Sequence, residues 1–210
     1  MLPPSLPLFP LPNVVLFPNV FLPLHIFEPR YRAMTADALA TDRLIGMVML
    51  RPGWEPHYEE EPPVYPVGCA GFITHADRLP DGRYNIMLRG LDKFRILSER
   101  PAREGLQQYR CARVDAIEES PRTRDLSAMQ VARARLERLI AKCLQRSTDD
   151  PVPKDIPDED LVHAIAQHLD PLEKQALLEC DGFLARCVAL VELLEMRLIA
   201  THPTGKTRMH

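Results

Sequence analysis

The sequence lacks the cysteine pattern of a disulfide-stapled or zinc-binding protein. Its 210 residues hold five cysteines, and no two of them form a Cys-x-x-Cys pair. No Lys or Arg precedes the apolar N-terminal run, and prolines interrupt any helix that an export signal would need. We therefore expect reduced thiols and a cytoplasmic protein. The cysteines are widely spaced along the chain: Cys69, Cys111, Cys143, Cys180 and Cys187.

Long apolar runs and a strong charge of either sign are also missing. The sequence has no window of about 18 uninterrupted apolar residues, so we expect no membrane-spanning helix. The formal net charge is −3, and residues 1–120 hold 13 Lys and Arg against 15 Asp and Glu. Only the segment 124–146 is basic, and a solvated helix face explains this without nucleic acid. We expect neither a membrane nor a nucleic acid as partner.

The motifs of nucleotide binding, hydrolysis and metal binding are incomplete or absent. Thr204-Gly205-Lys206-Thr207 resembles the end of a phosphate-binding loop, but Ala200 stands where the first glycine is required. No Gly-x-Ser-x-Gly elbow occurs. His163 and His168 are five residues apart on an expected helix, which places them on different faces. The sequence therefore predicts no nucleotide, no metal, no cofactor and no catalytic constellation.

A thiol site assembled by folding stays open as an alternative. We expect Cys69 and His75 on one strand and one face, but about 20 Å apart, too far for direct proton transfer. Another Cys–His pair could still meet in the fold, since such sites are not sequential.

Short alternating segments fill the first half of the chain. The 21 prolines are about twice the usual ~5% share. Pro80-Asp81-Gly82 predicts a hairpin, and Gly90 a bulge or sharp bend. So many short strands around one early helix indicate a compact barrel or rolled sheet. The helix is expected at 29–40, and the strands at 6–9, 14–17, 20–26, 44–50, 65–79, 83–88, 94–97 and 108–118.

The periodicity becomes helical after residue 119. Apolar residues at helical spacing predict one helix over 125–146, one from Asp158, one from Pro171 and one over 183–199. We expect an α+β protein with a β-barrel subdomain at 1–119 and an α-helical subdomain at 120–201. The polar tail at 202–210 is expected to be disordered.

The segment 51–63 is expected to be a loop, with four prolines, a glycine, four glutamates and the only tryptophan. Aromatic anchors beside sheet edges often hold extended peptides. We therefore expect the binding surface to include Trp54, His57, Tyr58 and Tyr65. The alternative, that these aromatic side chains fold back over the protein's own core, stays open.

Phe27-Glu28-Pro29-Arg30-Tyr31 marks a strand that turns sharply into a helix. Pro29 suits the first helical turn, which places Glu28 at or next to the N-cap. We interpret the five residues as scaffold, with Glu28 and Arg30 holding the junction and Phe27 and Tyr31 packing it.

The longer segment Pro23-Leu24-His25-Ile26-Phe27-Glu28-Pro29-Arg30-Tyr31 resembles the signature of the Lon protease N-terminal, substrate-binding domain. The similarity extends to 6–10, 14–18, 67–70 and 81–84, and to 90–96, where Lys93 replaces the usual Arg. Residues 174–179 and Arg186 resemble the helical part of that family. Neither the ATPase module nor the Ser–Lys peptidase domain of a full-length Lon protease is present, so the chain resembles a free-standing member.

This resemblance implies a PUA-like pseudo-barrel, similar to the Lon-like domain of cereblon, followed by a helical bundle. It also implies a non-enzymatic role in recognising polypeptides or partner proteins. RNA binding is the alternative from fold analogy, because PUA-like barrels include RNA readers. An enzyme with a Cys–His site is the other alternative.

Overall fold

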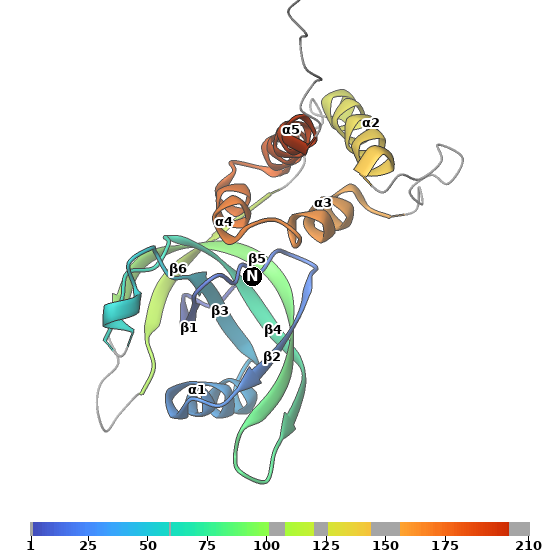
Figure 1. The fold of residues 1–210 in the computed structure, drawn as a ribbon. Coiled ribbons are helices and arrows are strands. Elements are labelled where there is room, and N and C mark those ends of the chain that lie inside the picture. The colour runs from blue at the N-terminus through green and yellow to red at the C-terminus, as the bar shows by residue number, and fades with distance from the viewer. Residues whose placement is uncertain (1, 59, 101–107, 120–125, 144–155, 202–210) are drawn as a thin grey trace, which may run out of the picture. The chain divides into compact units, whose positions relative to one another are not determined.

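The computed structural model describes residues 2–58, 60–100, 108–119, 126–143 and 156–201 (Figure 1). The chain divides into two compact units. The first comprises Met1–Glu118 and Gln167–Glu179, and the second Glu119–Ala166 and Cys180–His210.

The first unit is built on a closed barrel. Its strands are β1 (Ser5–Leu11), β2 (Phe21–Ile26), β3 (Leu44–Met49), β4 (Val67–Arg78), β5 (Tyr84–Arg100) and β6 (Cys111–Ile117), with helix α1 (Pro29–Ala40) after β2. β1 pairs with β3 in parallel, and β3–β4, β4–β5, β5–β6 and β6–β1 pair antiparallel. These five pairings form a ring, which removes most free strand edges. The expected barrel is confirmed.

β5 is the strand that joins the ring to β2. Its first part pairs with β2, from Tyr84 to Arg89, and its last part with β6, from Lys93 to Arg100. At Gly90, between the two parts, the backbone of Phe17 crosses so closely that a Cβ would lie 2.0 Å from the Phe17 carbonyl oxygen. Only glycine fits this crossing. The two strands expected at 83–88 and 94–97 are therefore one continuous strand.

Two other expectations for the first half need correction. Residues 14–17 form no strand, although Val15, Leu16 and Phe17 are buried. Their apolar character reflects burial rather than sheet pairing. A β-bulge between Ile73 and His75 changes the face that β4 presents, so Cys69 is buried while His75 is exposed.

The other predicted elements agree with the structure. β3 is buried at every position, as its apolar run predicts. Gly82, with a φ of +80°, closes the hairpin between β4 and β5, where its amide donates to the Leu79 carbonyl. Within the 51–63 segment, the residues that the structure describes form the short 3₁₀ helix η1 (Glu55–His57) and no other helix or strand.

Helix α4 (Pro171–Glu179) belongs to the barrel unit, which differs from the expected division at residue 119. The Gln175 side-chain amide donates to the Val67 carbonyl of β4 at 3.0 Å, and Gln175 is buried. Just before α4, Gln167 donates to the Val15 carbonyl at 3.4 Å. These polar contacts with backbone are invisible to a hydrophobic pattern, so the sequence placed α4 with the other helices.

The second unit contains three helices, α2 (Leu126–Cys143), α3 (Asp158–Ala166) and α5 (Phe183–Thr201). Both α2 and α3 contact α5. Predicted helices match all three within the described residues, while the linker at 147–153 and the tail at 202–210 lie outside them. Buried apolar side chains on each helix form the packing surfaces, among them Leu136 and Leu139, Leu161 and Val162, and Leu190 and Val191.

Candidate functional site

The Phe27–Tyr31 junction folds as its sequence predicts at the backbone. Glu28 is the N-cap residue of α1 with extended φ and ψ, and Pro29 occupies the first helical turn. The Glu28 carboxylate makes no capping bond to the helix. It instead accepts a hydrogen bond from Arg30 Nε at 2.9 Å, so the charged pair joins two neighbours across the proline.

Tyr58 ties the 51–63 loop to this junction. Its hydroxyl donates to Glu28 Oε1 at 2.5 Å. The Arg30 guanidinium lies 4.9 Å from the Tyr58 ring centroid and 4.7 Å from that of Tyr31, within cation–π range of both. Burial and the hydrogen bond to Glu28 raise the pKa of the Tyr58 phenol, which therefore stays a neutral donor at pH 7.

Tyr31 and Phe27, both interpreted as packing residues, differ in the structure. Tyr31 is buried, its ring centroid is 4.4 Å from that of Phe9, and its hydroxyl approaches the Pro10 carbonyl at 3.5 Å. Phe27 is 60% exposed and contacts the ring of His25, so its expected packing role is wrong. The junction turns at Glu28, which leaves Phe27 on the outer side.

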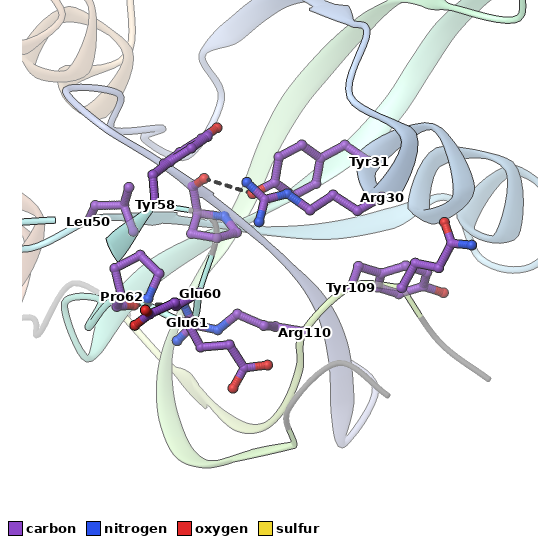
Figure 2. Close-up of a pocket in the computed structure, with 11 residues that line it drawn as sticks. Arg30, Tyr31, Leu50, Tyr58, Glu60, Glu61, Pro62, Tyr109 and Arg110 are labelled. Atoms are coloured by element: carbon purple, nitrogen blue, oxygen red, sulfur yellow. Dashed lines mark hydrogen bonds between the residues drawn. The ribbon is translucent and has the colours of Figure 1, made fainter. Parts of the chain in front are cut away.

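A cavity of about 280 Å³ opens beside this cluster. Figure 2 shows Arg30, Tyr31 and Tyr58 along one side of it, with Arg110, Glu60 and Glu61 facing them. Aromatic and proline side chains supply most of its apolar wall. The lining residues are Pro10, Arg30, Tyr31, Leu50, Tyr58, Glu60, Glu61, Pro62, Gln108, Tyr109 and Arg110.

The far wall is held by Arg110. Its Nη1 donates to the Pro62 carbonyl at 2.8 Å, and its Nε donates to Glu99 Oε2 at 3.0 Å, with Nη2 on the same oxygen. The neighbouring Tyr109 hydroxyl donates to Asp37 Oδ2 at 2.8 Å. Arg30, Tyr31, Tyr58, Tyr109 and Arg110 each have an intramolecular hydrogen-bond partner, which favours a cavity that is preformed rather than dependent on a ligand for its shape.

The four expected binding residues occupy different positions around this cavity. Tyr58 lines it, and Trp54 packs edge-on against Tyr58 with ring centroids 5.4 Å apart. His57 is exposed and contacts Glu60 Oε2 at 3.0 Å. Tyr65 is not a lining residue and instead lies near Arg51, 5.7 Å from the guanidinium. Trp54 and Tyr58 also pack against a buried cluster, as the alternative interpretation of the loop aromatics expected, and a binding role for the four residues stays a prediction.

Sequence reasoning missed Pro10, Pro62, Tyr109 and Arg110 as wall residues. They come from three separated segments that meet through sheet pairing. The Leu8 amide, for example, donates to the Arg110 carbonyl at 2.9 Å, which brings the start of β6 beside β1. No local pattern reports such a meeting. Arg30 and Tyr31 were assigned to scaffold, and they are both scaffold and wall.

The described residues offer little for metal or thiol chemistry. No three His, Cys, Asp or Glu side chains among them are grouped to hold a metal ion. Cys69 is fully buried. Burial raises the pKa of the Cys187 thiol to about 11, which disfavours the reactive thiolate at pH 7. The segment Thr204–Thr207 lies outside the described residues, and no helix within them is long and apolar enough to cross a membrane.

Comparison with known proteins identifies a family. A family profile described as "ATP-dependent protease La (LON) substrate-binding domain" matches residues 5–196. The chain is 29% identical to Lon protease 2 of Myxococcus xanthus over 210 residues, which covers 93% of this chain and 24% of that protein. A Lon protease of Anaeromyxobacter dehalogenans is 28% identical with the same coverage. The chain thus spans about a quarter of the length of these curated relatives.

Solved structures show the same fold. A Lon N-terminal domain protein from Xanthomonas campestris aligns with a TM-score of 0.59 at 24% identity, covering 91% of this chain and 97% of that one. The N-terminal domain of a Lon protease from the Mycobacterium avium complex aligns with a TM-score of 0.64 at 18% identity, covering 91% and 98%.

Proposed function

Because this chain belongs to the family of LON substrate-binding domains, we propose that it is a non-catalytic module that binds a polypeptide in the Tyr31–Tyr58 cavity. The supporting observation is the cavity itself, which has aromatic and proline walls and preformed polar partners. Aromatic side chains dominate the energetics of peptide and protein contacts because they bury large areas with few rotatable bonds.

The volume of the cavity supports a peptide rather than a larger ligand. About 280 Å³ is at or below the lower end for small-molecule sites, and it suits one or two side chains of an extended segment. The rest of that segment would lie over the 51–63 loop, where Trp54 supports Tyr58 from behind. Trp54 and Tyr58 then remain candidate contact residues, His57 contributes at the rim, and Tyr65 contributes least.

The absence of catalysis and a cytoplasmic location are parts of the same proposal. The matched family domain is a substrate-binding one, and in full-length relatives other parts of the chain would carry the remaining activities. The wide spacing of the five cysteines, without a Cys-x-x-Cys pair, supports a reducing compartment.

The test is a binding measurement with matched aromatic variants. The probe is a fluorescein-labelled ten-residue peptide with a central Leu-Phe-Leu segment between serines and glycines, followed by anisotropy. We expect Tyr58→Ala to weaken binding about tenfold, the scale of a contact worth about 1.4 kcal/mol, because it removes one wall of the cavity.

Tyr65→Ala is the matched control, since it removes a tyrosine from the adjoining segment that does not line the cavity. Urea unfolding followed by circular dichroism reports whether each variant stays folded, since the fluorescence of Trp54 would respond directly to loss of the Tyr58 ring that it packs against. Equal losses of affinity for both folded variants, or no loss for either, would show that the peptide does not bind in this cavity.

A further inference from the structure

The cavity's positive charges are already neutralised by the protein's own carboxylates. Arg30 is paired with Glu28 at 2.9 Å, and Arg110 with Glu99 and the Pro62 carbonyl. The Arg110 side chain is only 10% exposed. A ligand carboxylate would therefore have to compete with partly buried ion pairs, at a desolvation cost that few surface contacts recover.

The negative charges at the rim are placed differently. The Glu60 side chain is 73% exposed, and the adjacent Glu61 is exposed too. Glu60 accepts from His57, which is itself 57% exposed, so a ligand can approach the carboxylate from solvent. Among the described residues, two arginines line the cavity, and four glutamates line it or pair with those arginines, which favours a negative field at its mouth.

The walls and the rim thus favour two different features in one ligand, an apolar group and a positive charge. Pro10, Tyr31 and Tyr58 offer apolar surface to a single side chain, while Glu60 and Glu61 attract positive charge at the mouth. An apolar side chain with basic neighbours meets both demands, because the apolar side chain can fill the cavity while the charged heads of the neighbours reach the carboxylates at its mouth.

Accepting that the cavity binds polypeptide, as proposed above, we infer that its partner is an apolar anchor flanked by lysine or arginine. The anchor enters the cavity that Tyr31 and Tyr58 help to line, and the flanking basic residues lie over Glu60 and Glu61. Charge complementarity of this exposed kind tunes preference and encounter rate more than total affinity.

Three peptides test the inference with the full chain. They share the central Leu-Phe-Leu segment and differ only in their flanks, which are lysine, serine or glutamate. We expect the lysine peptide to bind about three- to tenfold tighter than the serine peptide, the range for two exposed ion pairs, and the glutamate peptide weakest. Raising the salt concentration should shrink the difference, since exposed pairs are screened.

The double variant Glu60→Gln with Glu61→Gln should reduce the lysine preference over the serine peptide to less than about twofold, because it removes both exposed carboxylates. Asp92→Asn with Asp115→Asn is the matched control: it removes two exposed carboxylates on β5 and β6 that do not line the cavity, and it should keep the preference.

The outcomes separate this inference from the proposed function. Equal affinity for the three peptides, or a preference for glutamate, would overturn the charge preference while leaving peptide binding in place. A lysine preference that survives in the Gln double variant would overturn it as well. Failure of all three peptides to bind the folded protein would overturn the proposed function at this cavity.

Discussion

Each unit of the molecule contains an arginine paired with a glutamate, and the two pairs have opposite surroundings. In the barrel unit, Arg30 lies over two tyrosine rings at the wall of an open cavity, and its side chain is 24% exposed. In the helical unit, Arg186 of α5 is fully buried. Its Nη2 donates to Glu119 at 2.5 Å, and its Nη1 lies 2.9 Å from His163 Nε2.

The difference distinguishes a site from a structural support. Arg186 is enclosed by its partners, with the His163 ring packed edge-on against Phe183 at 6.2 Å. Its guanidinium group serves to hold α3 and α5 together. The Glu28–Arg30–Tyr58 cluster also holds segments together, but it faces a space that another molecule can enter. A buried charge alone is therefore a weaker indication of a functional site than a charge beside a cavity, and on this ground the Arg30 cluster is the candidate.

Removing the enclosed arginine should produce the largest effect. Arg186→Met leaves Glu119 and His163 without this guanidinium in the interior, and breaking a buried pair costs about 3–5 kcal/mol. Urea unfolding followed by helical circular dichroism measures the loss, while Trp54 fluorescence follows the barrel unit.

Arg138→Met is the control, because Arg138 is exposed on α2, and it should shift unfolding by less than about 0.5 kcal/mol. An Arg186→Met protein as stable as the control would contradict the conclusion that Arg186 is a structural support. A Trp54 transition that shifts as far as the helical one would mean that the two units unfold together.

Alkaline pH should reveal the second effect, at Cys187 of α5. Burial raises its pKa from 9.0 to about 11, so the folded state keeps the proton that the unfolded state loses. Stability from this group is full below pH 9 and is lost as pH rises toward 11, by about 3 kcal/mol at most. Cys187→Ala should show a shallower decline over this range than the natural protein.

Cys180→Ala serves as the matched variant, since Cys180 is only partly buried and should retain the natural decline. Urea titrations at pH 8, 9, 10 and 11 give the comparison. Equal slopes for the natural protein and Cys187→Ala would show that the thiol is not shielded by its surroundings.

Removing one hydrogen bond from the Glu28–Arg30–Tyr58 cluster should lower the free energy of unfolding by less than either of the preceding changes. Tyr58→Phe removes the hydroxyl that donates to Glu28 but keeps the ring beside Arg30. Since both side chains are partly exposed and Glu28 retains Arg30, we expect a loss of about 1 kcal/mol in the Trp54 transition. Affinity for the serine-flanked peptide should change less than twofold, because the aromatic wall is preserved.

A loss above about 3 kcal/mol would make this cluster as structural as the one at Arg186 and would weaken the distinction between them. A large loss of affinity with unchanged stability would instead show that the hydroxyl contacts the peptide directly.

Local signals in the sequence predicted most of the fold. Pro29 after an alternating strand located the start of α1, and Pro80-Asp81-Gly82 located the β4–β5 hairpin. These features depend on neighbours within a few residues. Gly90 signalled a bend, but its actual constraint is the crossing backbone of Phe17, which belongs to another segment.

The cavity could not be predicted from such local signals, because its walls come from segments that are far apart in the sequence. Tyr58 was named because aromatic residues in a proline-rich loop are conspicuous, and it lines the cavity. Arg110 was not named, because its position depends on the pairing of β6 with β1 and on a carbonyl from Pro62. Helix α4 was assigned to the other helices because Gln175, which bonds to the barrel backbone, reads as a polar surface residue.

The smallest expected effect concerns Phe27, where sequence and structure disagree. A phenylalanine that is 60% exposed contributes little to the core, so Phe27→Ser should change the unfolding free energy by less than about 0.5 kcal/mol. Tyr31→Ser, four positions along the same junction, should cost several times more because its ring is buried against Phe9. Urea unfolding of the two variants therefore divides one short motif into a packed half and an exposed half. If Phe27→Ser also weakens peptide binding, the exposed surface at the end of β2 must contribute to the contact surface. Unchanged binding would confine the surface to the cavity side of the junction.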